Sequence, residues 1–108
     1  MKSKTDYKPL QILVNSPDDI FDIHRLDISK AIVQAMKFGY SKRRKVIDFA
    51  ELNFAGKMTV QLAIDRREFP ELIEKNIAIL EEFEEYELCA EALKLKQKIG
   101  KNKSKKGL

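Results

Sequence analysis

The stretch EFPELIEKNIAILEEFEEYELCAEALKLKQKI, residues 68–99, has the clearest structural pattern in the chain. Its apolar residues recur at spacings of three and four, as one face of an amphipathic helix requires. The acidic cluster at residues 81–87 interrupts the pattern, so we expect two helices with a solvated join. The residues expected to face inward are Phe69, Leu72, Ile73, Ile77, Leu80 and Phe83 on the first helix and Tyr86, Cys89, Ala90 and Leu93 on the second.

A β-hairpin is expected before these helices. In residues 58–64, MTVQLAI, large apolar residues alternate with polar or small ones, which is the period of a strand with one buried face. We expect that Met58, Val60, Leu62 and Ile64 face the helices. Residues 46–54, VIDFAELNF, form the expected partner strand, and residues 55–57 supply a turn that contains glycine. The apolar residues of the partner strand change phase near Phe49, which leaves two alternatives, cover on both faces or a β-bulge.

The sequence of the N-terminal half predicts one more strand and one more helix. Residues 10–14, LQILV, form a short apolar run typical of a buried strand. Residues 20–26 are too irregular to distinguish a second short strand from an ordered loop. Asp27 or Ser29 is the expected N-cap of a helix that ends at Gly39. The order of elements predicts an α+β fold, in which a small antiparallel sheet packs against three helices, the last two forming a hairpin.

The length and composition indicate one compact domain. The chain has 108 residues, of which 44% are hydrophobic, enough for a single core. We expect the domain over residues 10–99, a flexible arm at residues 1–9, and a disordered basic tail at residues 100–108 that begins where Gly100 ends the last helix. No apolar run reaches the roughly 20 residues of a membrane-spanning helix. The absence of a secretory signal and the single Cys89 predict a cytoplasmic protein without a membrane partner.

Candidate reactive residues are few and far apart. His24 is the only histidine and lies far from Cys89, so the sequence contains no zinc-ligand spacing. A general base at His24 is a weaker alternative than a structural histidine. Cys89 fits a buried packing position better than a catalytic thiol, because the neighbouring Glu87 and Glu91 raise a thiol pKa. We therefore expect no enzyme activity, no cofactor and no metal.

Two basic segments distribute the net charge of +4 unevenly. A loop after Gly39 that exposes four cations would hold phosphates, with Tyr40 available to stack on a base. The plainer alternative is a solubilising loop beside an aggregation-prone strand. Both segments on one face of the fold would favour nucleic-acid binding. The candidate residues are Lys42, Arg43, Arg44 and Lys45 in the loop and Lys101, Lys103, Lys105 and Lys106 in the tail.

The C-terminal third of the chain resembles a known helical hairpin. Residues 86–90, YELCA, are similar to the core of the UVR motif, in which an aromatic residue and Glu precede two small residues. This motif is shared by the B and C subunits of the bacterial excinuclease and by activators of protein arginine kinase. Its usual Arg-Asp continuation is replaced here by Leu93 and Lys94. The resemblance implies a protein-binding hairpin that pairs with like hairpins and has no catalytic role. The apolar positions of its first helix are matched by Leu72, Ile77 and Leu80.

These observations predict a non-enzymatic regulatory or adaptor protein that binds a protein partner, including another copy of itself, through the hairpin or the adjacent sheet. Apolar residues off the main helical stripes form the expected docking strip, rimmed by acidic residues. Scattered surface apolar residues are the alternative explanation. The second expected function is sequence-tolerant nucleic-acid binding through the basic segments. The candidate protein-binding residues are Ile79, Leu88 and Leu95, with Glu81, Glu84 and Glu85.

Overall fold

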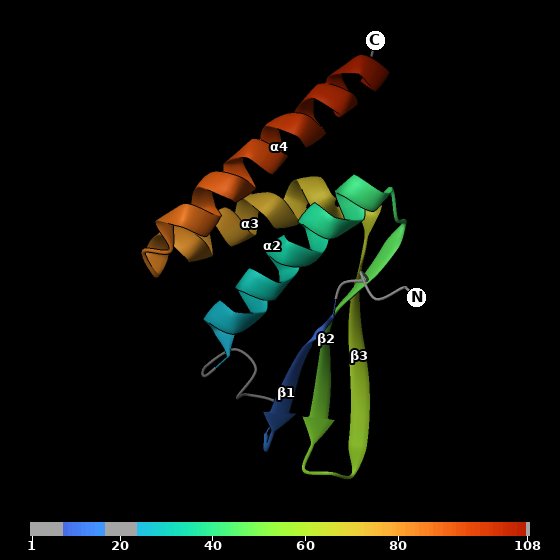
Figure 1. Ribbon diagram of the computed structural model, residues 1–108, viewed down its shortest axis with the longest axis vertical. Coiled ribbons are helices and arrows are strands. Elements are labelled where there is room, and N and C mark those ends of the chain that lie inside the picture. The colour runs from blue at the N-terminus through green and yellow to red at the C-terminus, as the bar shows by residue number, and fades with distance from the viewer. Residues whose placement is uncertain (1–7, 17–23, 108) are drawn as a thin grey trace.

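The computed structural model describes residues 8–16 and 24–107, with side chains as far as residue 100. Figure 1 shows a sheet packed against a layer of helices, with α3 and α4 forming a hairpin. The α+β fold, the β-hairpin and the C-terminal helical hairpin expected from the sequence are confirmed. Residues 1–7 of the expected arm and residues 20–23 lie outside the described residues. The elements are β1 (Leu10–Val14), α2 (Arg25–Lys42), β2 (Val46–Phe54), β3 (Met58–Asp65), the 3-10 helix η2 (Arg66–Glu68), α3 (Phe69–Glu82) and α4 (Tyr86–Gly107).

The sheet is mixed. Strand β2 lies between β1 and β3 and pairs antiparallel with β3. Strand β1 pairs with β2 in parallel, with Leu10 opposite Ala50 and Val14 opposite Phe54. The expectation of antiparallel pairing is therefore wrong for β1. The reason is that α2 carries the chain back to the starting end of the sheet before β2 begins, as in any βαβ crossover.

A β-bulge resolves the phase change in β2. The pairing register with β3 shifts between Asp48 and Ala50, because an extra residue in one strand re-aims the side chains that follow it. As a result, Phe49 and Ala50 are both buried although they are neighbours in the sequence. Of the two alternatives left open by the sequence, the bulge is the one present.

The helices cover only one end of the sheet. The β2–β3 turn lies at the opposite end, beyond the helical layer (Figure 1). Along β3, Ile64 is buried, Val60 and Leu62 are half-buried, and Met58 is 56% exposed. The expected inward row is thus confirmed at Ile64 and wrong at Met58, because Met58 lies next to the turn, where the helices do not reach.

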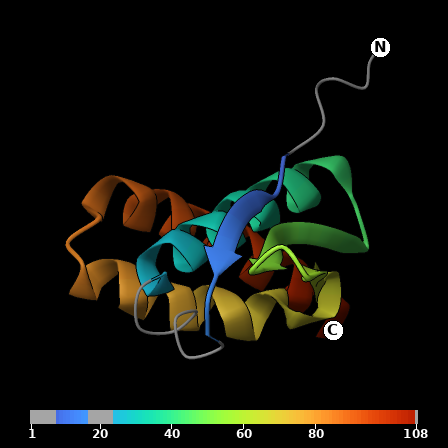
Figure 2. The ribbon, with the colours of Figure 1, turned by 90° about the horizontal axis from the view of Figure 1, so that it is seen from below.

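The hairpin of α3 and α4 closes the core. A turn at residues 83–85 joins the two helices at one end of the molecule (Figure 2). Tyr86 and Leu93, expected to face inward, are 65% and 44% exposed, and Phe83 is 41% exposed. The sequence of α4 contains two apolar stripes with helical spacing, and the second one is buried. That stripe consists of Leu88, Cys89, Ala92, Leu95 and Ile99.

A buried polar pair joins α2 to α3. The Ser29 hydroxyl donates to Asn76 Oδ1 at 2.6 Å, and Asn76 Nδ2 donates to the Leu72 carbonyl at 2.7 Å. Ser29 therefore packs inside α2 and is not its N-cap. The helix begins at Arg25, with His24 as the N-cap residue, and Asp27 lies in its first turn. Ser29 and Asn76, the buried polar side chains of the described residues, thus both have hydrogen-bond partners, as the cost of an unsatisfied one demands.

Gly39 and Gly100 were expected to end helices, but both helices continue past them. Gly39 lies inside α2, where a Cβ would stand 2.4 Å from Ile47 Cδ1. The absence of a side chain at Gly39 lets α2 approach β2 closely. Helix α4 continues past Gly100 to Gly107, so the backbone of the tail, expected to be disordered, is helical there. The lysines of this segment are good helix formers and oppose the negative end of the helix dipole.

Substitution of the two helical glycines by alanine is predicted to have opposite effects. Gly39→Ala forces the buried Ile47 side chain to move, and overpacking of this kind costs about 1–3 kcal/mol, more than the roughly 1 kcal/mol gained in helix propensity. Gly100→Ala gains the propensity alone, because its Cβ meets no described atom within 4 Å. Urea unfolding of the two variants measures both changes. A Gly39→Ala protein as stable as Gly100→Ala would contradict the close approach.

Candidate polyanion-binding groove

A groove of about 1010 Å³ lies between the C-terminal end of α2, the junction of β3 with η2, and α4. Most of its described lining residues are cationic, and Glu91 is the one anionic residue among them. A concave surface lined by one sign of charge concentrates its electrostatic potential. The lining residues are Lys37, Tyr40, Ser41, Arg43, Lys45, Arg66, Glu91, Lys94, Leu95 and Lys98.

The end of α2 forms one wall of the groove. The Arg44 N–H donates to the Gly39 carbonyl at 2.9 Å, and the Arg43 N–H donates to the Tyr40 carbonyl at 3.4 Å, the paired hydrogen bonds of a Schellman motif. Arg43 has a φ of 57°, in the left-handed region that glycine usually occupies at this position. The motif reverses the chain direction, and the side chains of residues 42–45 are all exposed.

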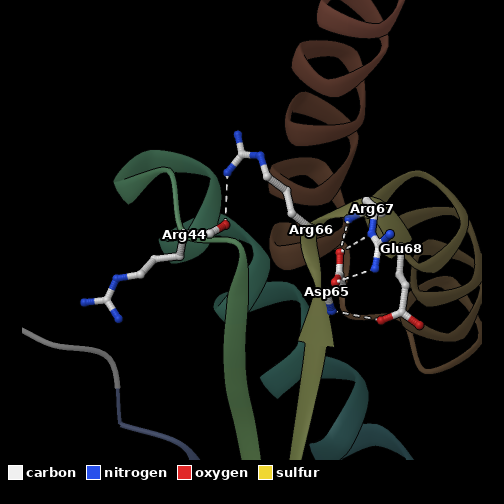
Figure 3. Close-up of polar contacts among 5 residues, drawn as sticks. All are labelled: Arg44, Asp65, Arg66, Arg67 and Glu68. Atoms are coloured by element: carbon white, nitrogen blue, oxygen red, sulfur yellow. Dashed lines mark hydrogen bonds and ion pairs between the residues drawn. The ribbon is translucent and has the colours of Figure 1, made fainter.

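Arg66 lines the groove at the junction of β3 with η2. Its Nη1 donates to the carbonyls of Gly39 and Arg44, at 3.1 and 3.3 Å. Figure 3 shows this side chain reaching from the end of β3 across to Arg44. The guanidinium also lies 5.1 Å from the ring centroid of Tyr40 and 5.9 Å from that of Phe69, within the range of cation–π attraction. One arginine thus joins the end of α2 to the end of β3 and the start of α3.

Asp65 and Arg67, on either side of Arg66, neutralise each other's charge. Asp65 accepts hydrogen bonds from the Arg67 N–H at 2.8 Å and from the Arg67 guanidinium at 3.1 Å, and Glu68 accepts from the Asp65 N–H at 2.8 Å (Figure 3). These bonds make a capping box that begins η2. The hydrogen bonds from the Arg67 side chain and backbone lower the pKa of Asp65. Asp65 therefore stays ionised and pairs with Arg67.

Helix α4 forms the opposite wall. Lys37 on α2 and Glu91 on α4 make an ion pair, and the Tyr40 hydroxyl donates to the Lys98 carbonyl at 3.4 Å. Arg66 lies over one face of the Tyr40 ring, so a base could stack only on the other face. The stacking expected at Tyr40 stays a prediction, and the groove presents mainly cations.

The structure places part of one predicted basic segment, the 42–45 loop, in the groove. Arg43 and Lys45 line the groove, whereas the Arg44 guanidinium lies over the Phe38 ring at 5.4 Å. Lys42 is exposed at the last residue of α2. Residues 101–107 continue α4 beyond Lys98, and their side chains are not described. The cationic lining residues outside the predicted candidate set are Lys37, Arg66, Lys94 and Lys98.

The expected docking strip on the hairpin is not exposed. Leu88 and Leu95 are 8% and 5% exposed and belong to the core, and Ile79 is half-buried. The expectation that Leu88 and Leu95 are exposed is therefore wrong, because both lie on the stripe of α4 that packs into the core. Their burial leaves the outward stripe, with Tyr86 and Leu93, in contact with solvent.

The acidic join contacts α2. Glu82 pairs with Arg25 at 3.0 Å, and Glu85 pairs with Lys30 at 3.8 Å. Glu81 and Glu84 are exposed at the same turn. Part of the expected acidic rim is thus an intramolecular electrostatic contact between the hairpin and α2.

The described residues contain no group of three or more His, Cys, Asp or Glu side chains able to hold a metal ion. Cys89 is buried, and burial, with the charge of Glu81, raises the pKa of its thiol. None of the described helices is both long enough and apolar enough to cross a membrane.

No family model matches the chain, and neither a curated protein nor a solved structure matches it. The resemblance of the hairpin to the UVR motif therefore stays a prediction. Function is inferred below from the geometry and charge of the groove.

Replacement of Arg43, whose φ lies in the left-handed region, is predicted to raise stability and to weaken polyanion binding. Arg43→Gly removes the strain of a side chain at positive φ, which is worth about 1 kcal/mol, and the protein should become more stable. The same change removes one cation from the groove and should weaken binding of a polyanion. Thermal unfolding and a binding titration on one sample measure the two effects. A decrease in stability would contradict the Schellman geometry at Arg43.

Proposed function

We propose that the protein binds the sugar–phosphate backbone of nucleic acids in the basic groove and catalyses no reaction. The observation that carries the proposal is the convergence of two distant segments. Arg43 and Lys45 from the end of α2 and the start of β2 face the same groove as Lys94 and Lys98 from α4, with Arg66 between them. Cations on both walls would neutralise successive phosphates and release their counterions.

The composition of the groove favours contacts with the backbone over contacts with bases. Lysines supply flexible point charges that bind phosphates without reading sequence. Tyr40 is the one aromatic residue among the described lining residues, and Arg66 covers one face of its ring. Recognition of single-stranded bases normally uses aromatic stacking. The proposed binding is therefore tolerant of sequence and strongly dependent on salt.

A second proposed role is protein docking on the hairpin, as expected for a regulatory or adaptor protein. Its support is the outward face of α4, where Tyr86 and Leu93 are 65% and 44% exposed and Ala90 is exposed between them. Exposed apolar residues grouped on one face favour an interaction surface. We propose a cytoplasmic location for both roles, in keeping with one cysteine that has no second cysteine to pair with.

Removal of two groove lysines is predicted to weaken binding of a fluorescent duplex DNA. Lys94→Gln with Lys98→Gln should lower affinity at least about tenfold at low salt and reduce the slope of log affinity against log salt by up to about two, since each phosphate contact contributes roughly 0.9 to that slope. Fluorescence anisotropy over a salt series measures both values.

The matched control is Lys57→Gln with Lys75→Gln. It removes the same charge from the β2–β3 turn and from α3, two exposed sites outside the groove lining. An equal loss in both double variants would show that net charge alone drives binding. That result, or a wild-type protein that does not bind at low salt, would overturn the proposed function.

Neutralising the groove carboxylate is predicted to strengthen binding. Glu91→Gln removes the anionic lining residue and frees Lys37 from its ion pair, so affinity for the same duplex should rise several-fold at low salt. Glu74→Gln is the control, because it frees Lys96 from a 3.6 Å pair outside the groove lining. Equal effects of the two substitutions would count against a localised site.

A further inference from the structure

Strand β3 forms an edge of the described sheet. Among the described strands β2 is its one neighbour, so its other side carries backbone groups available to a further strand. The seven residues from Met58 to Ile64 include no charged residue and no proline. Soluble proteins commonly use charged residues and proline to prevent pairing at an exposed edge.

The helix-facing row of β3 is incompletely covered. Helix α2 packs on β2, and β3 lies at the outer margin of the sheet (Figure 1). Val60 and Leu62 pack against the core from one side but remain half-buried. A strand added beside β3 would cover them further.

The sequence of β3 is complementary to itself in apolar surface. In an antiparallel pair of β3 strands related by a two-fold axis at Gln61, the register places Val60 beside Leu62 of the second copy. Lys57 of each copy then lies near Asp65 of the other, which already pairs with its own Arg67. The apolar contacts therefore favour this register.

We propose that β3 is a self-association edge, on which a second copy of this chain pairs its own β3 in antiparallel orientation. The two sheets then form one continuous sheet, and the two-fold axis stands perpendicular to it. Backbone hydrogen bonds hold the strands together, the contacts between Val60 and Leu62 favour this register, and the helices of both copies lie on the same face. This pairing is independent of the basic groove.

Sedimentation velocity of the full chain over a concentration series, without nucleic acid, tests the proposal. The wild-type protein should show a monomer–dimer equilibrium. Gln61→Lys should weaken the dimer at least about tenfold, because it places like charges directly opposite each other at the axis. Gln61 is exposed and donates a 3.4 Å hydrogen bond to Glu51 on β2. A lysine at this position can pair with the same carboxylate, so the melting temperature of the monomer should not fall.

Gln11→Lys is the matched control, since Gln11 is an exposed residue on the other edge strand, β1. It should leave the dimer intact. As a second measurement, Gln61→Cys should form an intermolecular disulfide under mild oxidation and Gln11→Cys should not, because opposed residues of antiparallel strands lie within disulfide range. A monomer at every concentration, or a dimer that Gln11→Lys disrupts and Gln61→Lys does not, would overturn the proposal and leave the edge to another strand.

Discussion

The guanidinium of Arg66 is the interaction on which the groove and its surroundings depend. It donates to the carbonyls of Gly39 and Arg44 and lies against the rings of Tyr40 and Phe69. Charge-assisted hydrogen bonds of this kind are stronger than neutral ones. The cation also opposes the negative end of the α2 dipole. One side chain therefore stabilises a helix terminus and contributes positive charge to the groove.

Close packing places α2 where Arg66 reaches it. Gly39 lets the helix approach the buried Ile47 of β2, and the Schellman motif then turns the chain into β2 within a few residues. On the opposite side, the Lys37–Glu91 ion pair and the contact between Tyr40 and the Lys98 carbonyl attach α4 to α2. The groove lies where α2 and α4 meet one end of the sheet, and its cations come from α2, the turn between α2 and β2, η2 and α4.

Local patterns in the sequence predicted much of the fold and little of the groove. Alternation in β3 and helical spacing in α3 are properties of consecutive residues. Both elements are present, although Met58 and Phe83, expected to face inward, are exposed beside their ends. The parallel pairing of β1 depends on a partner strand far along the chain. The sequence of α4 contains a second, equally apolar stripe with Tyr86 and Leu93. Helical spacing alone therefore did not predict that Leu88 and Leu95 are the buried residues. Arg43 and Lys45 were found because they belong to a basic run, whereas Arg66 and Lys94 become groove residues through tertiary contacts alone.

The most direct measurement of the central claim is an NMR titration of the ¹⁵N-labelled full chain with a short duplex DNA at low salt. Binding in the groove predicts amide shift changes concentrated at residues 37–45, at Arg66 and at residues 91–98, and reversal of those changes as salt is added. Changes concentrated instead at residues 58–64 of β3 or at the acidic turn, or an unchanged spectrum, would contradict the account.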